Sequence, residues 1–279
     1  MELKTVVAVI RGQEDMERVV AVAAALVRDS NGHLVGVHAE PSPAAYVPAI
    51  GAEGIPYDES IIEANRKRMQ ALEDSFNAKC NAEGISCEWR GAETFMGDSA
   101  ISSITSALAA DLVIAQQIDP DKEDDPAVDL EALVFETGRP VLFVPYTWKA
   151  PLELGKVVVA WNGSRESARA VFDALPFLVK AGKTEILCID PQESDEHSAL
   201  MAASEIAQSL DRHGIKTEVV NQASGGIPAS AAIQNRMSDS GTNLLVMGAY
   251  SKSRIRERLF GGVTRTMLKS MTALTLMSR

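Results

Sequence analysis

Short apolar runs and amphipathic stretches alternate along the whole chain. The segments 4–27 and 156–179 both begin with a β-rich apolar run, continue through a polar turn that contains glycine, and end with apolar residues at helical spacing. The apolar runs are short and do not alternate with polar residues, which is typical of strands buried on both faces of a parallel sheet. The pattern therefore predicts strands and helices in regular alternation.

The same order of elements occurs twice, which indicates two copies of one arrangement. Each copy is expected to be a doubly wound, Rossmann-like α/β domain with a parallel five-stranded sheet, over residues 1-147 and 154-279. The first copy is the longer one, and its Pro/Gly-rich stretch 42–60 is interpreted as an extended loop. The remaining strands are expected in paired segments: 33–41 with 184–192, 82–89 with 212–219, 110–116 with 242–248, and 139–145 with 271–277.

Composition is that of a globular protein, with 46% hydrophobic and 23% charged residues among 279. The net charge of -11 disfavours general binding to nucleic acid or to an anionic membrane, because both would repel the chain. The cysteines Cys80, Cys87 and Cys188 form no C-x-x-C pair, so neither a disulfide framework nor a zinc site is indicated. With no secretory signal and no apolar run of about 18–20 residues, a cytoplasmic protein is expected.

A basic loop with two glycines follows the fourth strand of the second copy. Gly261 and Gly262 precede residues at helical spacing, and Thr264 lies in the expected first turn. Glycines let a phosphate approach backbone N–H groups, and the positive end of a helix dipole favours an anion. The loop therefore predicts a phosphate site, with a solvated glycine turn as the alternative. Four basic residues precede the glycines: Lys252, Arg254, Arg256 and Arg258.

The first copy lacks these groups. Asp119 stands opposite Ser251, Asp129 opposite Gly261, Leu130 opposite Gly262, and Ala132 opposite Thr264. Carboxylates at such positions repel phosphate at close range. The first copy is therefore expected to keep the fold without the nucleotide motif.

Over essentially its whole length the chain resembles a tandem universal stress protein of the UspA type. Nucleotide-binding members have a glycine, two residues, a second glycine, nine residues, and a glycine followed by serine or threonine. Here Gly248 is the first glycine, Ser251 replaces the second, Gly261 is the third, and Gly262 takes the Ser/Thr position. The family's aspartate at the end of the first strand corresponds to Asn162.

This resemblance implies that the second copy binds an adenine nucleotide, namely ATP, ADP or AMP, with Mg²⁺ held through the phosphates. Core packing is the alternative for Ala160, and a turn or helix-capping role is the alternative for Asp190. The implied nucleotide contacts are Ala160, Trp161, Asn162, Ile189, Asp190, Met247, Gly248, Ala249, Ser251, Lys252, Arg254, Gly261, Gly262, Val263 and Thr264.

Three functions remain open at this stage. The first is nucleotide-dependent binding of a protein partner, the second is a nucleotide-free scaffold with both sites degenerate, and the third is a slow ATPase. Glu257 is the only acid in the loop 249–262, so no catalytic residue or metal ligand is assigned, and a binding protein is favoured over an enzyme. The fifth strands, in 139–145 and 271–277, are expected to meet in an intramolecular pseudo-dimer, and a homodimer is a further alternative.

Overall fold

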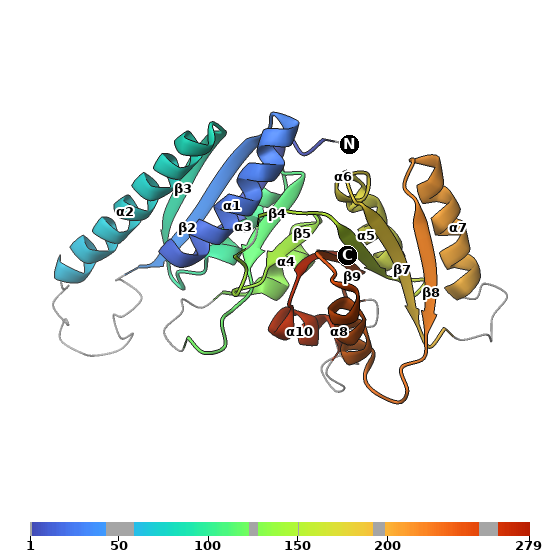
Figure 1. Cartoon of the computed structure of the whole chain (residues 1–279). Helices are drawn as coiled ribbons and strands as arrows, with labels where there is room; N and C mark the ends of the chain where they lie inside the picture. Colours follow the sequence, from blue (N-terminus) through green and yellow to red (C-terminus); the bar gives the residue numbers. More distant parts are fainter. Residues whose placement is uncertain (1, 43–58, 123–127, 150, 192–198, 251–261) are drawn as a thin grey trace. The chain divides into compact units, whose positions relative to one another are not determined.

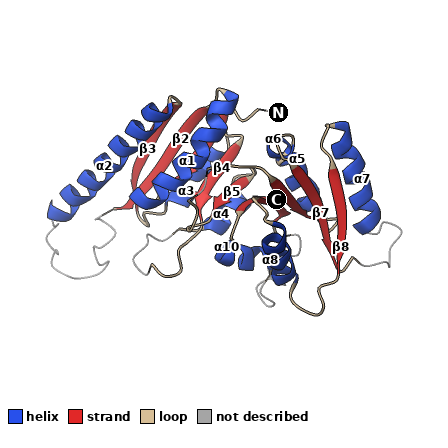
Figure 2. Cartoon of the chain, viewed as in Figure 1, coloured by secondary structure: helices blue, strands red, loops and turns tan. Residues whose placement is uncertain are grey.

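The computed structural model describes residues 2–42, 59–122, 128–149, 151–191, 199–250 and 262–279. Strands and helices alternate through both copies, which confirms the predicted α/β fold (Figure 1 and Figure 2). The chain divides into two compact units, Leu3–Thr137 and Gly138–Arg279.

The first unit contains a parallel sheet with the strand order β3-β2-β1-β4. Helices α1 and α2 pack on one face of this sheet, α3 packs on the other, and α4 lies against α3 (Figure 1). Its strands are β1 (Thr5–Val9), β2 (His33–Pro41), β3 (Ser86–Thr94) and β4 (Leu112–Gln116). Its helices are α1 (Gln13–Ser30), α2 (Glu59–Glu83), α3 (Ser99–Ala107) and α4 (Leu130–Glu136).

The second unit contains a sheet with the strand order β5-β10-β9-β6-β7-β8. Helices α5 and α7 cover one face, and α8 and α10 pack together on the other (Figure 2). Its strands are β5 (Val141–Val144), β6 (Lys156–Ala160), β7 (Lys183–Ile189), β8 (Thr217–Gln222), β9 (Leu244–Gly248) and β10 (Leu274–Ser278). Its helices are α5 (Arg165–Asp173), α6 (Leu175–Leu178), α7 (Ala199–Arg212), α8 (Ala229–Ser240) and α10 (Val263–Ser270).

The fifth strand of the first copy lies in the second unit. β5 pairs antiparallel with β10, with Phe143 opposite Thr275 and Leu142 opposite Leu276, whereas the other strand pairs of this sheet are parallel. The predicted meeting of the two fifth strands is therefore confirmed. An unpaired edge of β10 would expose a row of backbone N–H and C=O groups, and β5 covers that edge.

The cores follow from the apolar runs that the sequence contains. The central residues of β1, β4, β5, β6 and β9 are fully buried or nearly so, as expected for parallel strands between helical layers.

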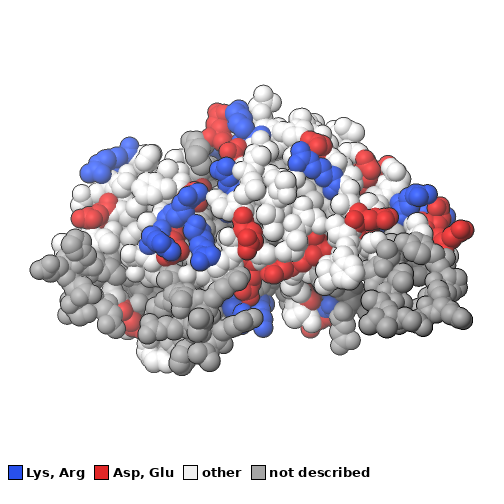
Figure 3. Space-filling view, turned by 180° about the vertical axis from the view of Figure 1, so that it is seen from behind, with Lys and Arg blue, Asp and Glu red and all other residues white. Residues whose placement is uncertain are grey.

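Acidic and basic side chains lie next to one another on the face that Figure 3 shows. Within the part of the chain that the structure describes, no helix is both long and apolar enough to span a bilayer.

Candidate functional site

The carboxyl ends of three neighbouring strands in the second unit define the predicted site. β6 lies between β7 and β9, with Ala160 opposite both Leu187 and Met247. Strand order reverses between β6 and β9, and ligands of doubly wound sheets bind at such a switch point. The segments that follow these strands, which begin at Trp161, Asp190 and Ala249, therefore emerge at one edge of the sheet.

A hydrogen bond joins the end of β9 to the start of α10. The backbone N–H of Tyr250 donates to the hydroxyl Oγ1 of Thr264 at 3.1 Å, and both residues are buried. Tyr250 has a φ of 54°, an uncommon conformation for a residue with a side chain. This contact holds the N-terminus of α10 beside the end of β9. The sequence predicts that the Thr264 hydroxyl faces an anion, and in the structure that hydroxyl accepts this backbone hydrogen bond.

Gly262 is the residue that precedes α10, and Val263 is the first residue of the helix. Gly262 has a φ of −55°, which any residue can adopt, and it supplies no side chain to cap the helix. Its carbonyl accepts a hydrogen bond from the N–H of Thr266 at 3.2 Å. A glycine here has no side chain that could occupy the first N–H groups of α10, and such groups are suited to an anion. Four predicted contacts lie outside the described residues: Ser251, Lys252, Arg254 and Gly261.

Gly248, the last residue of β9, is in close contact with the first turn of α5. A Cβ atom at this position would lie 2.4 Å from the backbone N of Ser167 and 2.5 Å from the carbonyl carbon of Glu166. Ser164 caps the same helix end, because its hydroxyl accepts a hydrogen bond from the N–H of Ser167 at 3.1 Å. The close approach of strand and helix therefore requires a glycine, whether or not a ligand binds.

The residues after β6 form a turn before α5. The side-chain oxygen of Asn162 accepts a hydrogen bond from the N–H of Ser164 at 3.1 Å, and Asn162 is exposed. The N–H of Trp161 donates to the carbonyl of Leu187 at 2.9 Å, and the Trp161 ring is buried. Ala160, half-buried, completes β6. Asn162 is the member of this turn that presents polar atoms at the sheet edge.

Asp190 links the end of β7 to the turn at 223–226. Its carboxylate Oδ1 accepts a hydrogen bond from the N–H of Ser224 at 2.9 Å, and its own φ is 44°. Hydrogen bonds from the Ser224 hydroxyl and N–H lower the pKa of Asp190 below its ordinary value. The turn role that the sequence left open for Asp190 is thus observed. Ile189, half-buried, precedes it.

Two residues at this edge were not predicted from the sequence. Tyr250 supplies the N–H that binds Thr264. Ser278 lies opposite Gly248 in the register of β10, and its carbonyl accepts a hydrogen bond from Ala249 at 2.8 Å. The Ser278 hydroxyl is buried without a hydrogen-bond partner among the described residues. Neither residue stands out in the sequence, because each role depends on strand register. Met247, also buried, lies beside them.

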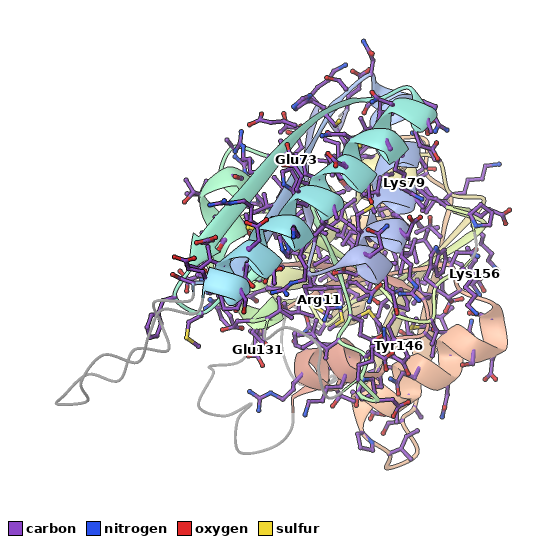
Figure 4. The ribbon with its side chains drawn as sticks, turned by 90° about the vertical axis from the view of Figure 1, so that its left-hand side faces the viewer. Arg11, Glu73, Lys79, Glu131, Tyr146 and Lys156 are labelled. Atoms are coloured by element: carbon purple, nitrogen blue, oxygen red, sulfur yellow. The ribbon has the colours of Figure 1, made fainter. Side chains whose placement is uncertain are left out.

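The equivalent edge of the first unit is occupied by its own charged side chains. Asp129 caps α4, because its carboxylate accepts a hydrogen bond from the N–H of Ala132 at 3.0 Å. Gln116, at the end of β4, accepts a hydrogen bond from Arg18 at 3.1 Å. An acidic cap supplies the negative charge that a phosphate would bring, so the two would repel each other. Figure 4 labels Glu131, which adds a second acid to the first turn of α4.

Comparisons with known proteins agree on the fold. No protein-family model matches the sequence, and no curated protein does either. A universal stress protein from Archaeoglobus fulgidus DSM 4304 is 13% identical with a TM-score of 0.71, covering 98% of this chain and 96% of that chain. A candidate universal stress protein from Pseudomonas aeruginosa UCBPP-PA14 is 16% identical with a TM-score of 0.59, covering 99% and 93%.

The same fold also occurs outside stand-alone stress proteins. The cytoplasmic domain of a prokaryotic cation chloride cotransporter is 11% identical, with a TM-score of 0.50, and the match covers 99% of this chain and 95% of that chain. The chain therefore has the universal stress protein fold over essentially its whole length. A fold of this kind hosts several functions, so the function has to be argued from the site.

Proposed function

We propose that the chain is a tandem universal stress protein whose second copy, residues 154-279, binds an adenine nucleotide. The ligand is ATP, ADP or AMP, and Mg²⁺ is held through the phosphates. The observation that carries the proposal is the hydrogen bond between Tyr250 and Thr264, which fixes the N-terminus of α10 beside the switch point between β6 and β9. A helix N-terminus at a switch point is suited to a phosphate group.

The local chemistry supports an anion at this place. Gly262 leaves the start of α10 without a side-chain cap, whereas Asp129 caps the corresponding α4 of the first unit. The adjoining loop of the sequence supplies Lys252 and Arg254, which would neutralise phosphates. The exposed Asn162 and Asp190, at the ends of β6 and β7, offer hydrogen-bonding groups to the nucleoside.

The nucleotide controls the binding of a protein partner to the segment between β9 and α10, most of which lies outside the described residues. The first copy, residues 1-147, serves as the structural partner of the second in an intramolecular pseudo-dimer. The pairing of β5 with β10 supports this arrangement, because the last strand of one copy completes the sheet of the other. We further propose that the protein acts in the cytoplasm.

A nucleotide-free scaffold is the second candidate, and packing at two of the predicted positions favours it. The α5 backbone accounts for the glycine at position 248, and the Ser164 N–H already uses the side-chain oxygen of Asn162. Neither residue therefore needs a ligand to explain its identity. The two candidates differ in whether purified protein contains or binds a nucleotide.

The test uses the full chain and a matched pair of variants at one position. Gly262→Asp introduces the acidic cap that the first unit has at Asp129, and Gly262→Ser introduces a neutral cap. The wild type and both variants are titrated with a fluorescent ATP derivative to measure binding. In addition, wild-type protein is acid-denatured, and mass spectrometry is used to detect released nucleotide. We expect Gly262→Asp to weaken ATP binding by at least about tenfold, which is about 1.4 kcal/mol, and Gly262→Ser to retain it.

Thermal unfolding of both variants controls for misfolding. If folded Gly262→Asp and the wild type bind ATP equally well, the nucleotide does not bind at α10. That result would overturn the proposed site. Absence of released nucleotide together with absence of ATP binding by the wild type would favour the scaffold.

A further inference from the structure

The first unit contains a cavity of about 470 Å³ beyond the carboxyl ends of β1 and β2. Residues 11–13 line it after β1, residues 38–41 line it in β2, and Arg68, Ala71 and Leu72 line it from α2. A volume of this size is typical of small-molecule sites. Figure 4 labels Arg11 near the N-terminal end of α1. The cavity lies in the copy that has lost the phosphate-binding residues.

Polar contacts join α2 to the end of β2 at the wall of the cavity. Asn65 on α2 is buried, and its amide Nδ2 donates to the carbonyl of Pro41 at 3.0 Å, which ties α2 to the end of β2. Arg68, one turn further along, makes two hydrogen bonds to the carboxylate of Glu40, at 3.3 and 3.2 Å. These contacts tie α2 to the end of β2 at the wall of the cavity.

The charged groups at the wall already have partners within the chain. The Nε of Arg11 lies 3.1 Å from Oδ2 of Asp15, and both side chains are buried. The other carboxylate oxygen of Asp15 accepts a hydrogen bond from the N–H of Gly12 at 2.8 Å, so the first turn of α1 is capped by its own acid. Glu40 is paired with Arg68. Burial by itself would raise the pKa of Glu40, but hydrogen bonds from His38 and Arg68 lower it below its ordinary value.

The side chains of His38 and Gln13 at the wall also have hydrogen-bond partners. His38 has Nδ1 2.9 Å from the carbonyl of Ile10 and Nε2 3.4 Å from Oε1 of Glu40. The amide Nε2 of Gln13 donates to Glu17 at 3.4 Å. Hydrogen bonds from a polar ligand to Asp15, Glu40 or the ring of His38 would compete with contacts that the protein already makes. A charged ligand would in addition lose its hydration without gaining a new counter-ion.

A polar recess beside this cavity is also lined by side chains that are paired with one another. It has a volume of about 190 Å³ and lies between the ends of β1 and β4. Lys122 forms an ion pair with Glu14, and Arg18 binds Gln116. The charged side chains at the wall of this recess therefore already have partners within the first unit. The surface of the cavity that a ligand can contact is therefore mainly apolar. It comes from Ala39, Pro41, Ala71 and Leu72.

We propose that the cavity of the first unit binds an uncharged, mostly apolar small molecule. The driving force is burial of the ligand's apolar surface against the apolar wall, and the paired charges around it exclude anions. This assignment gives the first copy a binding role of its own. It is independent of nucleotide binding by the second copy, because it uses only residues of the unit Leu3–Thr137.

The test uses the uncharged dye Nile red, the full chain, and two matched variants of α2. Ala71 lines the cavity and is exposed at its mouth, so Ala71→Trp fills the cavity without disturbing the core. Ala78 is exposed on the same helix outside the cavity wall, so Ala78→Trp is the control. We expect saturable Nile red fluorescence with the wild type and Ala78→Trp, and binding weakened by at least about tenfold in Ala71→Trp.

Competition titrations test the charge preference. ATP and the aromatic sulfonate 1-anilinonaphthalene-8-sulfonate are expected to leave Nile red bound, and Gly262→Asp is expected to leave Nile red binding unchanged. Equal Nile red binding by Ala71→Trp and Ala78→Trp would show that the dye binds elsewhere, for example at the exposed Phe95 and Met96, and would overturn the proposal. Non-saturable binding by the wild type, or displacement of the dye by either anion, would overturn it as well.

Discussion

The carboxylate of Glu185 on β7 accepts two parallel hydrogen bonds from the guanidinium of Arg236 on α8. The Nε–Oε1 distance is 2.7 Å and the Nη2–Oε2 distance is 2.8 Å. Lys156 on β6 adds a third contact, with its Nζ 3.1 Å from Oε2. Glu185 is fully buried, whereas Arg236 is partly exposed. The pair fastens α8 to the sheet near the N-terminal ends of β6 and β7.

Replacing Glu185 should destabilise the second unit. Glu185→Gln keeps the shape of the side chain but leaves two cations next to each other without their counter-ion. Loss of one partner from a buried ion pair costs about 3 kcal/mol. Urea unfolding of the full chain, followed by circular dichroism, measures the change. Glu218→Gln is the control, because the pair of Glu218 with Lys183 is exposed. If Glu185→Gln and Glu218→Gln lower the free energy of unfolding equally, burial of Glu185 does not strengthen its ion pair, which would contradict the prediction.

The same pair should contribute to acid sensitivity. Burial by itself would raise the pKa of Glu185, but the hydrogen bonds and positive charges of Arg236 and Lys156 lower it. Because the folded-state value lies below the unfolded value of about 4.3, the stabilisation is present above that pH and is lost as the pH falls through the folded-state pKa. We expect the free energy of unfolding to fall more steeply below about pH 4.3 in the wild type than in Glu185→Gln. Urea titrations at several pH values test this, and parallel curves would count against it.

Gly248→Ala should destabilise the protein without any ligand present. The added methyl group would overlap the backbone of Glu166 and Ser167, and strain of this kind costs about 1–3 kcal/mol. Gly12→Ala is the matched control in the first unit, because its φ is −171° and nothing lies within 4 Å of the new methyl group. Thermal unfolding of nucleotide-free protein measures both. If Gly248→Ala is as stable as Gly12→Ala, close packing against α5 does not explain the glycine at position 248. Access for a ligand would then be the remaining explanation.

The thiols should differ in reactivity in the folded protein. Burial raises the pKa of Cys188 to about 11. Burial and the neighbouring Cys87 thiol raise that of Cys80. At pH 8 a thiol with such a pKa is thiolate in only about one molecule in a thousand. Iodoacetamide labelling followed by mass spectrometry should modify the half-buried Cys87 first, and all three thiols at similar rates in urea. Fast native labelling of Cys188 would contradict its burial.

The predicted site lies among strands and a helix that the sequence pattern indicated. Strands were expected within 184–192 and 242–248 and a helix after Gly262, and the structure has β7, β9 and α10 there. Their ligand contacts remain predictions. The structure also explains two of the predicted site residues without a ligand. Gly248 packs against α5, and the Thr264 hydroxyl accepts a hydrogen bond from the Tyr250 N–H. A glycine can be required because a helix packs close to it or because a phosphate binds close to it. The sequence motif alone does not distinguish these two causes.

By itself the sequence determined the order of strands and helices, their repetition, and the absence of the glycine motif from the first copy. These features are local, since burial of a strand or a helix face is encoded in the spacing of apolar residues along the chain. Only the tertiary structure decided that Glu185 meets Arg236, that Asp190 meets Ser224, and that the first unit keeps a cavity lined by paired charges. Such contacts join residues far apart in the chain, and they depend on strand register and helix packing, for which a sequence pattern has no marker.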